Sequence, residues 1–308
     1  MTPYMVGEVH FYSTEIDGEL VLFDTGPPTP EGRAVLESAV DLKRLRHIFV
    51  THCHVDHYGQ AAYLAEHSDA EIYFPRQDVL RLERLKEWIA GVHRLLRAAG
   101  FPEEYCVRLK HLFLSQDMLA PTPRRYRVVE ESEVPARLGI EVIACPGHSQ
   151  SDLVYRYQGE AVTGDVLLRE IFQSPSLDLD VETFDGRFRN YEAYCASLVK
   201  LAALEGEKIL PSHRQYLPSV NAALLFYVRK LIDRAGQVKR YAGVDLVSEV
   251  VRQIFGPSLT NPFVIYLKAS EIYFMRDFLA APHLLQQALE TADLFGPVAD
   301  LFHGVVDE

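Results

Sequence analysis

Thr51-His52-Cys53-His54-Val55-Asp56-His57 places three histidines and one carboxylate within six consecutive residues. The apolar run Ile48-Phe49-Val50 precedes it and predicts a buried strand, so the polar cluster is expected on the loop where that strand ends. This mixture of ligands favours zinc, iron or manganese, because calcium prefers all-oxygen ligands. Only 12 histidines occur in 308 residues, so the cluster predicts a metal site rather than a chance grouping.

Further along the chain, three turns each carry one potential metal ligand directly after a predicted strand. They are Pro146-Gly147-His148-Ser149, Thr163-Gly164-Asp165 and Pro211-Ser212-His213. Upstream, Asp24-Thr25-Gly26 follows the apolar run Val21-Leu22-Phe23 in the same way. Each motif alone is most often a simple turn. Layered α/β proteins, however, usually place their functional residues on loops at strand ends.

The pattern of predicted elements changes near residue 218. Strands and helices alternate before it, interrupted by two predicted helices over residues 77–98 and 103–119. Beyond it, residues 220–235, 244–255, 262–279 and 283–295 have the periodicity of amphipathic helices. We therefore expect a catalytic domain over residues 1–218 with a helical insertion at 77–119, and an all-helical region over 219–308. The insertion is equally consistent with a cover over a site and with a pair of core helices.

Composition limits the classes of function. A net charge of -12 disfavours attraction to nucleic acid or to anionic membranes. The four cysteines form no CxxC pair, so neither a disulfide framework nor a thiolate zinc site is expected. No basic segment followed by an apolar one marks a signal peptide, and no apolar stretch is long enough to span a bilayer. A cytoplasmic enzyme with a small-molecule substrate is expected, and a homodimer remains open.

The order of these motifs resembles the metallo-β-lactamase-fold hydrolase superfamily over residues 1–216. The resemblance implies an α/β fold, a four-layer αββα sandwich with a dinuclear metal site, here followed by a C-terminal helical appendage. It implies that His52, His54 and His148 bind one metal and that Asp56, His57 and His213 bind the second, with Asp165 bridging both. Asp24 would hold the histidine loop in place from behind the ligands.

Details of the motifs indicate which branches of the superfamily the chain resembles. A bridging Asp165 resembles the glyoxalase II and RNA-processing branches, and His54 stands where the flavodiiron branch has glutamate. Gln60 and the sequence Ser212-His213-Arg214 depart from the glycines common in the superfamily at these places. Both departures change side chains at the rim of the expected site.

The function implied is hydrolysis of an acyl thioester or ester, or of a lactone, in the manner of glyoxalase II. Two divalent metals, zinc first and iron or manganese as alternatives, would lower the pKa of a shared water from about 15.7 towards 7. Asp165 and Asp56 are the expected catalytic carboxylates. Alternatives are a metal-dependent ribonuclease, a mononuclear iron persulfide dioxygenase and a non-catalytic interaction module. Four further residues adjoin the expected ligands and are either substrate contacts or rim packing: Tyr58, Arg169, Arg214 and Tyr216.

Overall fold

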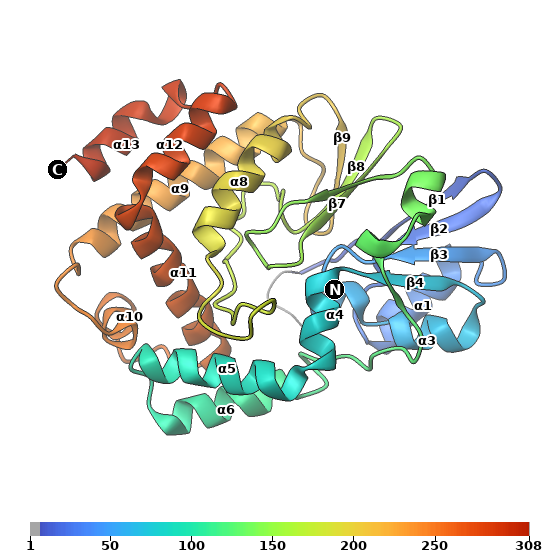
Figure 1. Cartoon of the computed structure of the whole chain (residues 1–308), viewed down its shortest axis with the longest axis horizontal. Coiled ribbons are helices and arrows are strands. Elements are labelled where there is room, and N and C mark those ends of the chain that lie inside the picture. Colours follow the sequence, from blue (N-terminus) through green and yellow to red (C-terminus); the bar gives the residue numbers. More distant parts are fainter. Residues whose placement is uncertain (1–6, 308) are drawn as a thin grey trace.

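The computed structural model in Figure 1 describes residues 7–307, whose strands form two sheets. The predicted strand over residues 4–12 lies partly outside this range, and β1 begins at Tyr12. The first sheet has the order β1(Tyr12–Ile16), β2(Glu19–Phe23), β3(Leu45–Phe49), β4(Glu71–Phe74), β5(Arg127–Val128). The second has the order β6(Glu141–Ala144), β7(Leu153–Tyr157), β8(Glu160–Gly164), β9(Lys208–Pro211). From β2 to β5 neighbouring strands are parallel, as are β8 and β9, while the remaining pairs are antiparallel.

Alternation along the strands explains how the two sheets pack. Val21 and Phe23 of β2 belong to a core cluster that also contains Leu153 and Tyr155 of β7, so these side chains fill the space between the sheets. Leu22, between them in sequence, points to the opposite face and packs in a second cluster with Leu36 and Leu64. Those residues lie on α1(Pro30–Ala39) and α3(Ala61–His67), which cover the outer face of the first sheet.

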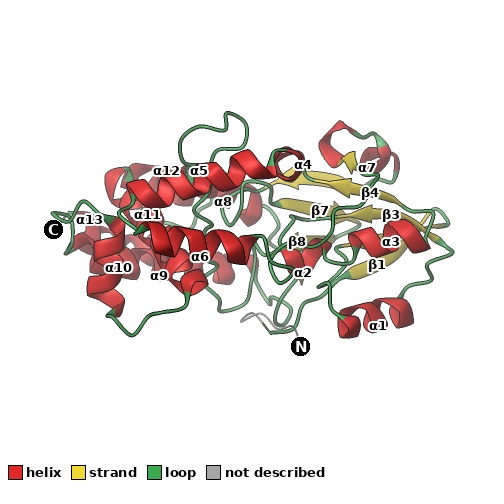
Figure 2. Cartoon of the chain, turned by 90° about the horizontal axis from the view of Figure 1, so that it is seen from below, coloured by secondary structure: helices red, strands yellow, loops and turns green. Residues whose placement is uncertain are grey.

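The helix α8(Asn190–Ala202) covers the outer face of the second sheet. Its Leu198 is fully buried in a third cluster, together with Val154 of β7 and Ile209 of β9. The layers are therefore helix, sheet, sheet and helix, which confirms the predicted four-layer α/β sandwich. The strands gather at one end of the molecule and the C-terminal helices at the other (Figure 2).

The predicted insertion contains more than two helices. The expected helix over 77–98 is in fact α4(Arg76–Glu83) followed by α5(Leu85–Ala98), because Arg84 leaves the helical conformation with φ -112° and ψ 35°. Hydrophobic periodicity continues across this one-residue break, so the pattern did not reveal it. The next helix, α6(Glu103–Phe113), ends earlier than predicted and packs on the C-terminal helices, where the Tyr105 hydroxyl donates to the Pro262 carbonyl at 2.9 Å.

The predicted C-terminal helices are present as α9(Val220–Lys239), α10(Val247–Phe255), α11(Pro262–Ala280) and α12(Pro282–Thr291). Ser219 caps α9 and Asn261 caps α11, each by accepting hydrogen bonds from backbone N–H groups of the first turn. Pro262 and Pro282 occupy first-turn positions, where a missing N–H has no cost. Beyond the four predicted helices, a short 3-10 turn at Gly296–Val298 leads into α13(Ala299–Val306). Among the described residues, no helix combines the length and apolar character that crossing a bilayer requires.

Candidate metal centre

The potential ligands come together because four loops leave their strands at the same edge of the sandwich. The loops follow β3, β6, β8 and β9 and carry the histidine cluster, His148, Asp165 and His213. Gly164, just before Asp165, has φ +53°, and a Cβ there would lie 2.8 Å from Thr51 Oγ1. Glycine at this position therefore allows the Asp165 turn to approach the histidine loop closely.

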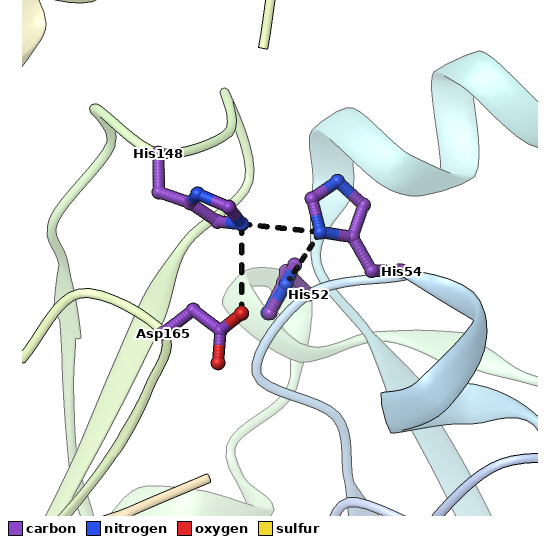
Figure 3. A group of neighbouring side chains, drawn as sticks. All are labelled: His52, His54, His148 and Asp165. Carbon is purple, nitrogen blue, oxygen red and sulfur yellow. Dashed lines mark hydrogen bonds and ion pairs between the residues drawn. The ribbon is translucent and has the colours of Figure 1, made fainter. Parts of the chain in front are cut away.

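The first cluster consists of His52, His54, His148 and Asp165 (Figure 3). His54 Nδ1 lies 2.9 Å from His52 Nε2 and 3.1 Å from His148 Nε2, and His148 Nε2 lies 3.7 Å from Asp165 Oδ2. The three ring nitrogens and one carboxylate oxygen therefore face one another within the reach of a single ion.

The second cluster consists of Asp56, His57 and His213. His213 Nε2 lies 3.4 Å from both Asp56 Oδ2 and Asp165 Oδ1, and His57 Nε2 lies 3.6 Å from Asp165 Oδ1. Asp165 thus directs one oxygen to each cluster. His57 Nε2, His213 Nε2 and Asp165 Oδ1 are buried and have no hydrogen-bond partner, which is unfavourable unless another group binds them. A metal ion would satisfy all three atoms, so the residues present fit two ions.

A second set of contacts orients the rings. His57 Nδ1 lies 2.9 Å from Asp24 Oδ2, His148 Nδ1 lies 3.0 Å from the Ser174 carbonyl, and His213 Nδ1 lies 2.7 Å from the Glu8 carbonyl. A ring nitrogen that faces such an acceptor carries the proton, which leaves the lone pair of Nε2 directed inward. Asp24 has φ 58°, an uncommon conformation outside glycine. Its Oδ1 also accepts from the Thr51 backbone N–H at 2.8 Å.

Electrostatics keep the rings of His52 and His54 and the carboxylate of Asp165 in the forms that bind cations. Burial lowers the pKa of His52 and of His54 well below the usual range, so both rings are neutral. Burial alone would raise the pKa of Asp165, but His57 and His213 more than offset it and hold that pKa well below its usual range. The carboxylate between the clusters therefore remains charged. In the second cluster, burial alone would lower the pKa of His57 and of His213, but Asp165 and Asp56 more than offset it and raise both pKa values. A metal ion binding there would therefore displace protons.

Two residues outside the motifs fix the histidine loop, and the sequence reading did not single them out. Asp78 and Arg81, three residues apart on α4, form an ion pair of 2.8 Å. Asp78 Oδ2 accepts from the Cys53 N–H at 2.7 Å, and Arg81 Nη2 donates to the Cys53 carbonyl at 2.6 Å. The pair therefore holds both polar groups of the residue between His52 and His54. The i, i+3 spacing of Asp78 and Arg81 in the sequence is typical of an ion pair on a helix, but no feature of the sequence indicates that the pair binds the backbone of Cys53.

The C-terminal helices also reach the site, through segment 173–177. His148 contacts this segment twice, since Ser176 N donates to the His148 carbonyl at 2.9 Å and the Ser174 carbonyl faces its ring. The Ser174 hydroxyl donates to Glu271 of α11 at 2.8 Å. Glu271 is 6% exposed and accepts from Arg234 and Lys268, both at 2.9 Å. The position of His148 thus depends on a buried charged group some 120 residues further along the chain.

We expect Glu271→Ala to weaken retention of metal by about tenfold, because partners behind the ligands typically contribute 10- to 100-fold in affinity. Retention would be measured by competition with a chelator, beside the thermal midpoint of unfolding. Asp277→Ala is the matched control, since Asp277 is a buried carboxylate on the same helix that pairs with Arg187 at 2.7 Å and not with segment 173–177. Equal metal loss in both variants would contradict the specific link to His148.

A cavity of about 300 Å³ opens on these side chains and includes His54, Asp56, His148 and Asp165 in its lining. Four residues that adjoin the ligands in sequence do not reach it. Tyr58 is fully buried, and its hydroxyl donates to the Ala120 carbonyl at 3.1 Å. Arg169, Arg214 and Tyr216 are exposed, and Arg169 donates to Gln215 at 2.9 Å. These four residues therefore do not line the cavity, and a contact between any of them and a substrate stays a prediction.

Comparison with known proteins is consistent with this geometry. A family model described as the metallo-beta-lactamase superfamily matches residues 7–213. A metallo-beta-lactamase family protein from Thermus thermophilus is 20% identical with a TM-score of 0.69, covering 91% of each chain. A beta-lactamase domain protein from Burkholderia ambifaria is also 20% identical, with a TM-score of 0.67, covering 91% of this chain and 84% of its own. No curated protein sequence matches the chain.

Proposed function

The chain belongs to the metallo-beta-lactamase superfamily, and on this premise we propose that it is a dinuclear metal-dependent hydrolase of acyl thioesters or esters. The observation that carries the proposal is the placement of Asp165. Its two oxygens face two separate ligand clusters, 3.7 Å from His148 Nε2 and 3.4 Å from His213 Nε2. Zinc is the first choice for both ions, since the donors are imidazole nitrogens and carboxylate oxygens.

Two such ions, when bound, supply hydroxide at neutral pH and polarise the scissile carbonyl. The chain holds the ligands in place, through Asp24 behind His57 and through the Asp78–Arg81 pair behind Cys53. In the hydrolysis, the oxygen of water joins the acyl carbon, the bond from that carbon to sulfur or oxygen breaks, and the leaving group takes a proton. Asp56, 3.4 Å from His213, is a second choice for carrying that proton, because binding a metal ion would reduce its basicity.

The cavity favours an apolar acyl group over a polyanion. Its walls include Leu82 and Leu85 from the insertion, Phe113 from α6 and Leu267 from α11. Arg81 is the one lysine or arginine among its described lining residues. Phosphodiester substrates require several such cations.

A ribonuclease is the weaker alternative, because the described lining of the cavity offers one cation for the phosphates of RNA. The tight basic cluster Arg124-Arg125 with Arg127 lies outside the cavity lining, and Arg127 is already paired with Glu71 at 2.7 Å. A mononuclear iron dioxygenase would leave Asp56, His57 and His213 without a role, although these residues are clustered and buried.

Hydrolysis should become more efficient as the acyl group gains apolar surface. Each buried methylene contributes at most about 0.8 kcal/mol, so two added carbons should raise kcat/KM by about tenfold until the cavity is filled. Steady-state kinetics with acetyl, butyryl and hexanoyl thioesters of one thiol would measure this, at low and high salt. A flat response to acyl length, together with RNA cleavage that falls steeply as salt rises, would favour the nuclease instead.

A further inference from the structure

One arginine in the cavity has more hydrogen-bond donors than the protein satisfies. The Arg81 side chain is 18% exposed, and its Nη2 is bound by Asp78 and by the Cys53 carbonyl. Its Nε is enclosed without a partner, and among the described residues no acceptor contacts Nη1. A guanidinium has five N–H groups; because Nε is enclosed, only the two on Nη1 are left for a group in the cavity. Because Arg81 lines the cavity, its Nη1 donors are available to a ligand there.

The acidic groups near Arg81 cannot supply that acceptor, because their oxygens are already bound. Asp78 forms an ion pair with Arg81 through Oδ1 and accepts from the Cys53 N–H through Oδ2. Asp178 accepts from the Trp88 indole, from the Gln150 amide at 2.8 Å and from its neighbour's backbone N–H. These bonds also fix the indole ring of Trp88, whose centroid lies 5.5 Å from the guanidinium carbon of Arg81.

The surroundings favour a carboxylate as the missing group. The Nη1 donors, together with the positive charge, suit one oxygen of a carboxylate, and apolar walls strengthen the interaction by excluding water. A phosphate would call for a second cation, and no other lysine or arginine lines the described cavity. Arg81 also binds the carbonyl between His52 and His54, so the site lies beside the ligand loop and within the same cavity.

We propose that Arg81 forms a subsite for a carboxylate, so that the acyl group of the substrate is apolar in its middle and carries a terminal carboxylate. The nature of the bond cleaved rests on the proposed function, whereas binding of a carboxylate at Arg81 does not. The products would be a dicarboxylic acid and a thiol or alcohol.

Selectivity tests the subsite during turnover. Succinyl, glutaryl and adipoyl thioesters of one thiol would be compared with thioesters in which the terminal carboxylate is replaced by a carboxamide of the same shape. For the best chain length, we expect the wild-type protein to prefer the carboxylate by at least about tenfold in kcat/KM. Arg81→Met should abolish the preference. If the substitution also disturbs the histidine loop, kcat/KM should fall equally for the carboxylate and the carboxamide substrates, so the ratio of the two values would not change.

Arg84→Met is the matched control, since Arg84 ends the same helix, pairs with Glu87 and does not line the cavity. It should keep the wild-type preference. If Arg81→Met does not fold, Arg81→Lys replaces it. Lysine keeps the charge but lacks the Nη1 donors, so the preference should fall at least about threefold. A wild-type preference below twofold at every chain length, or one that survives in the Arg81 variants, would overturn the subsite.

Binding without turnover separates the subsite from the proposed chemistry. The chain has 1 tryptophan, Trp88, which lines the cavity beside Arg81. Titrating the metal-loaded protein with hexanoate should give a saturable change in its fluorescence that hexanamide does not produce. The change should persist in Arg84→Met and disappear in Arg81→Met. If hexanoate binding depends on Arg81 but the protein hydrolyses no thioester, the subsite is retained and the proposed function is rejected. If the protein hydrolyses thioesters but shows no Arg81-dependent fluorescence change, the proposed function is retained and the subsite is rejected.

Discussion

Replacing Asp165 with alanine is expected to lower kcat/KM by about 1000-fold and to reduce the metal content from two ions per chain to about one. The two oxygens of Asp165 face opposite clusters, 3.7 Å from His148 and 3.4 Å from His213, so one substitution removes a ligand from both sites. Loss of a single preorganised polar group at a reaction centre already costs 10²- to 10³-fold. Elemental analysis of protein purified without added metal, beside steady-state kinetics, would measure both quantities.

Asp56→Asn provides the comparison. Asp56 faces His213 in the second cluster, and asparagine keeps an oxygen at that place without the charge. Its loss of activity should be smaller, about tenfold, as for a weakened rather than a deleted ligand. Either variant with unchanged kcat/KM would contradict the dinuclear mechanism. One ion per wild-type chain, measured with excess metal supplied, would favour the iron dioxygenase.

Much of the fold could be predicted because the deciding signals are local. Apolar runs such as Ile48-Phe49-Val50, each followed by a polar turn, predict strands whose ends carry function. The order of those turns identified the superfamily, and with it the neighbourhood of His148, Asp165 and His213. Spacing alone would not have placed residues that lie more than 90 positions from His54 beside it.

Residues that act across the chain could not be predicted. Asp78 and Arg81 contact the backbone of Cys53, and a backbone partner has no signature in the sequence. Glu271 reaches the site through Ser174, a polar residue in a loop without periodic pattern. In both cases helices outside the sandwich hold the ligands in position.

The largest expected effect on stability concerns the pair on α4. Asp78→Ala leaves the Arg81 guanidinium and the Cys53 N–H without their partner, in a place where Asp78 is 4% exposed. Removing one member of a buried ion pair costs about 3–5 kcal/mol, because the other charge remains desolvated. Urea unfolding of the metal-loaded protein, followed by circular dichroism, would measure the change in the free energy of unfolding.

Two further variants make this result specific. Glu87→Ala removes the acid of another i, i+3 pair, Arg84 with Glu87, whose side chains are 43% and 59% exposed. Water screens that pair, so its loss should leave the unfolding curve unchanged. The double variant Asp78→Ala with Arg81→Met removes the unpaired charge as well and should recover part of the lost stability. Two outcomes would show that Asp78 and Arg81 are not a buried pair that fixes the loop. One is an Asp78→Ala variant as stable to unfolding as Glu87→Ala, and the other is a double variant no more stable than Asp78→Ala alone.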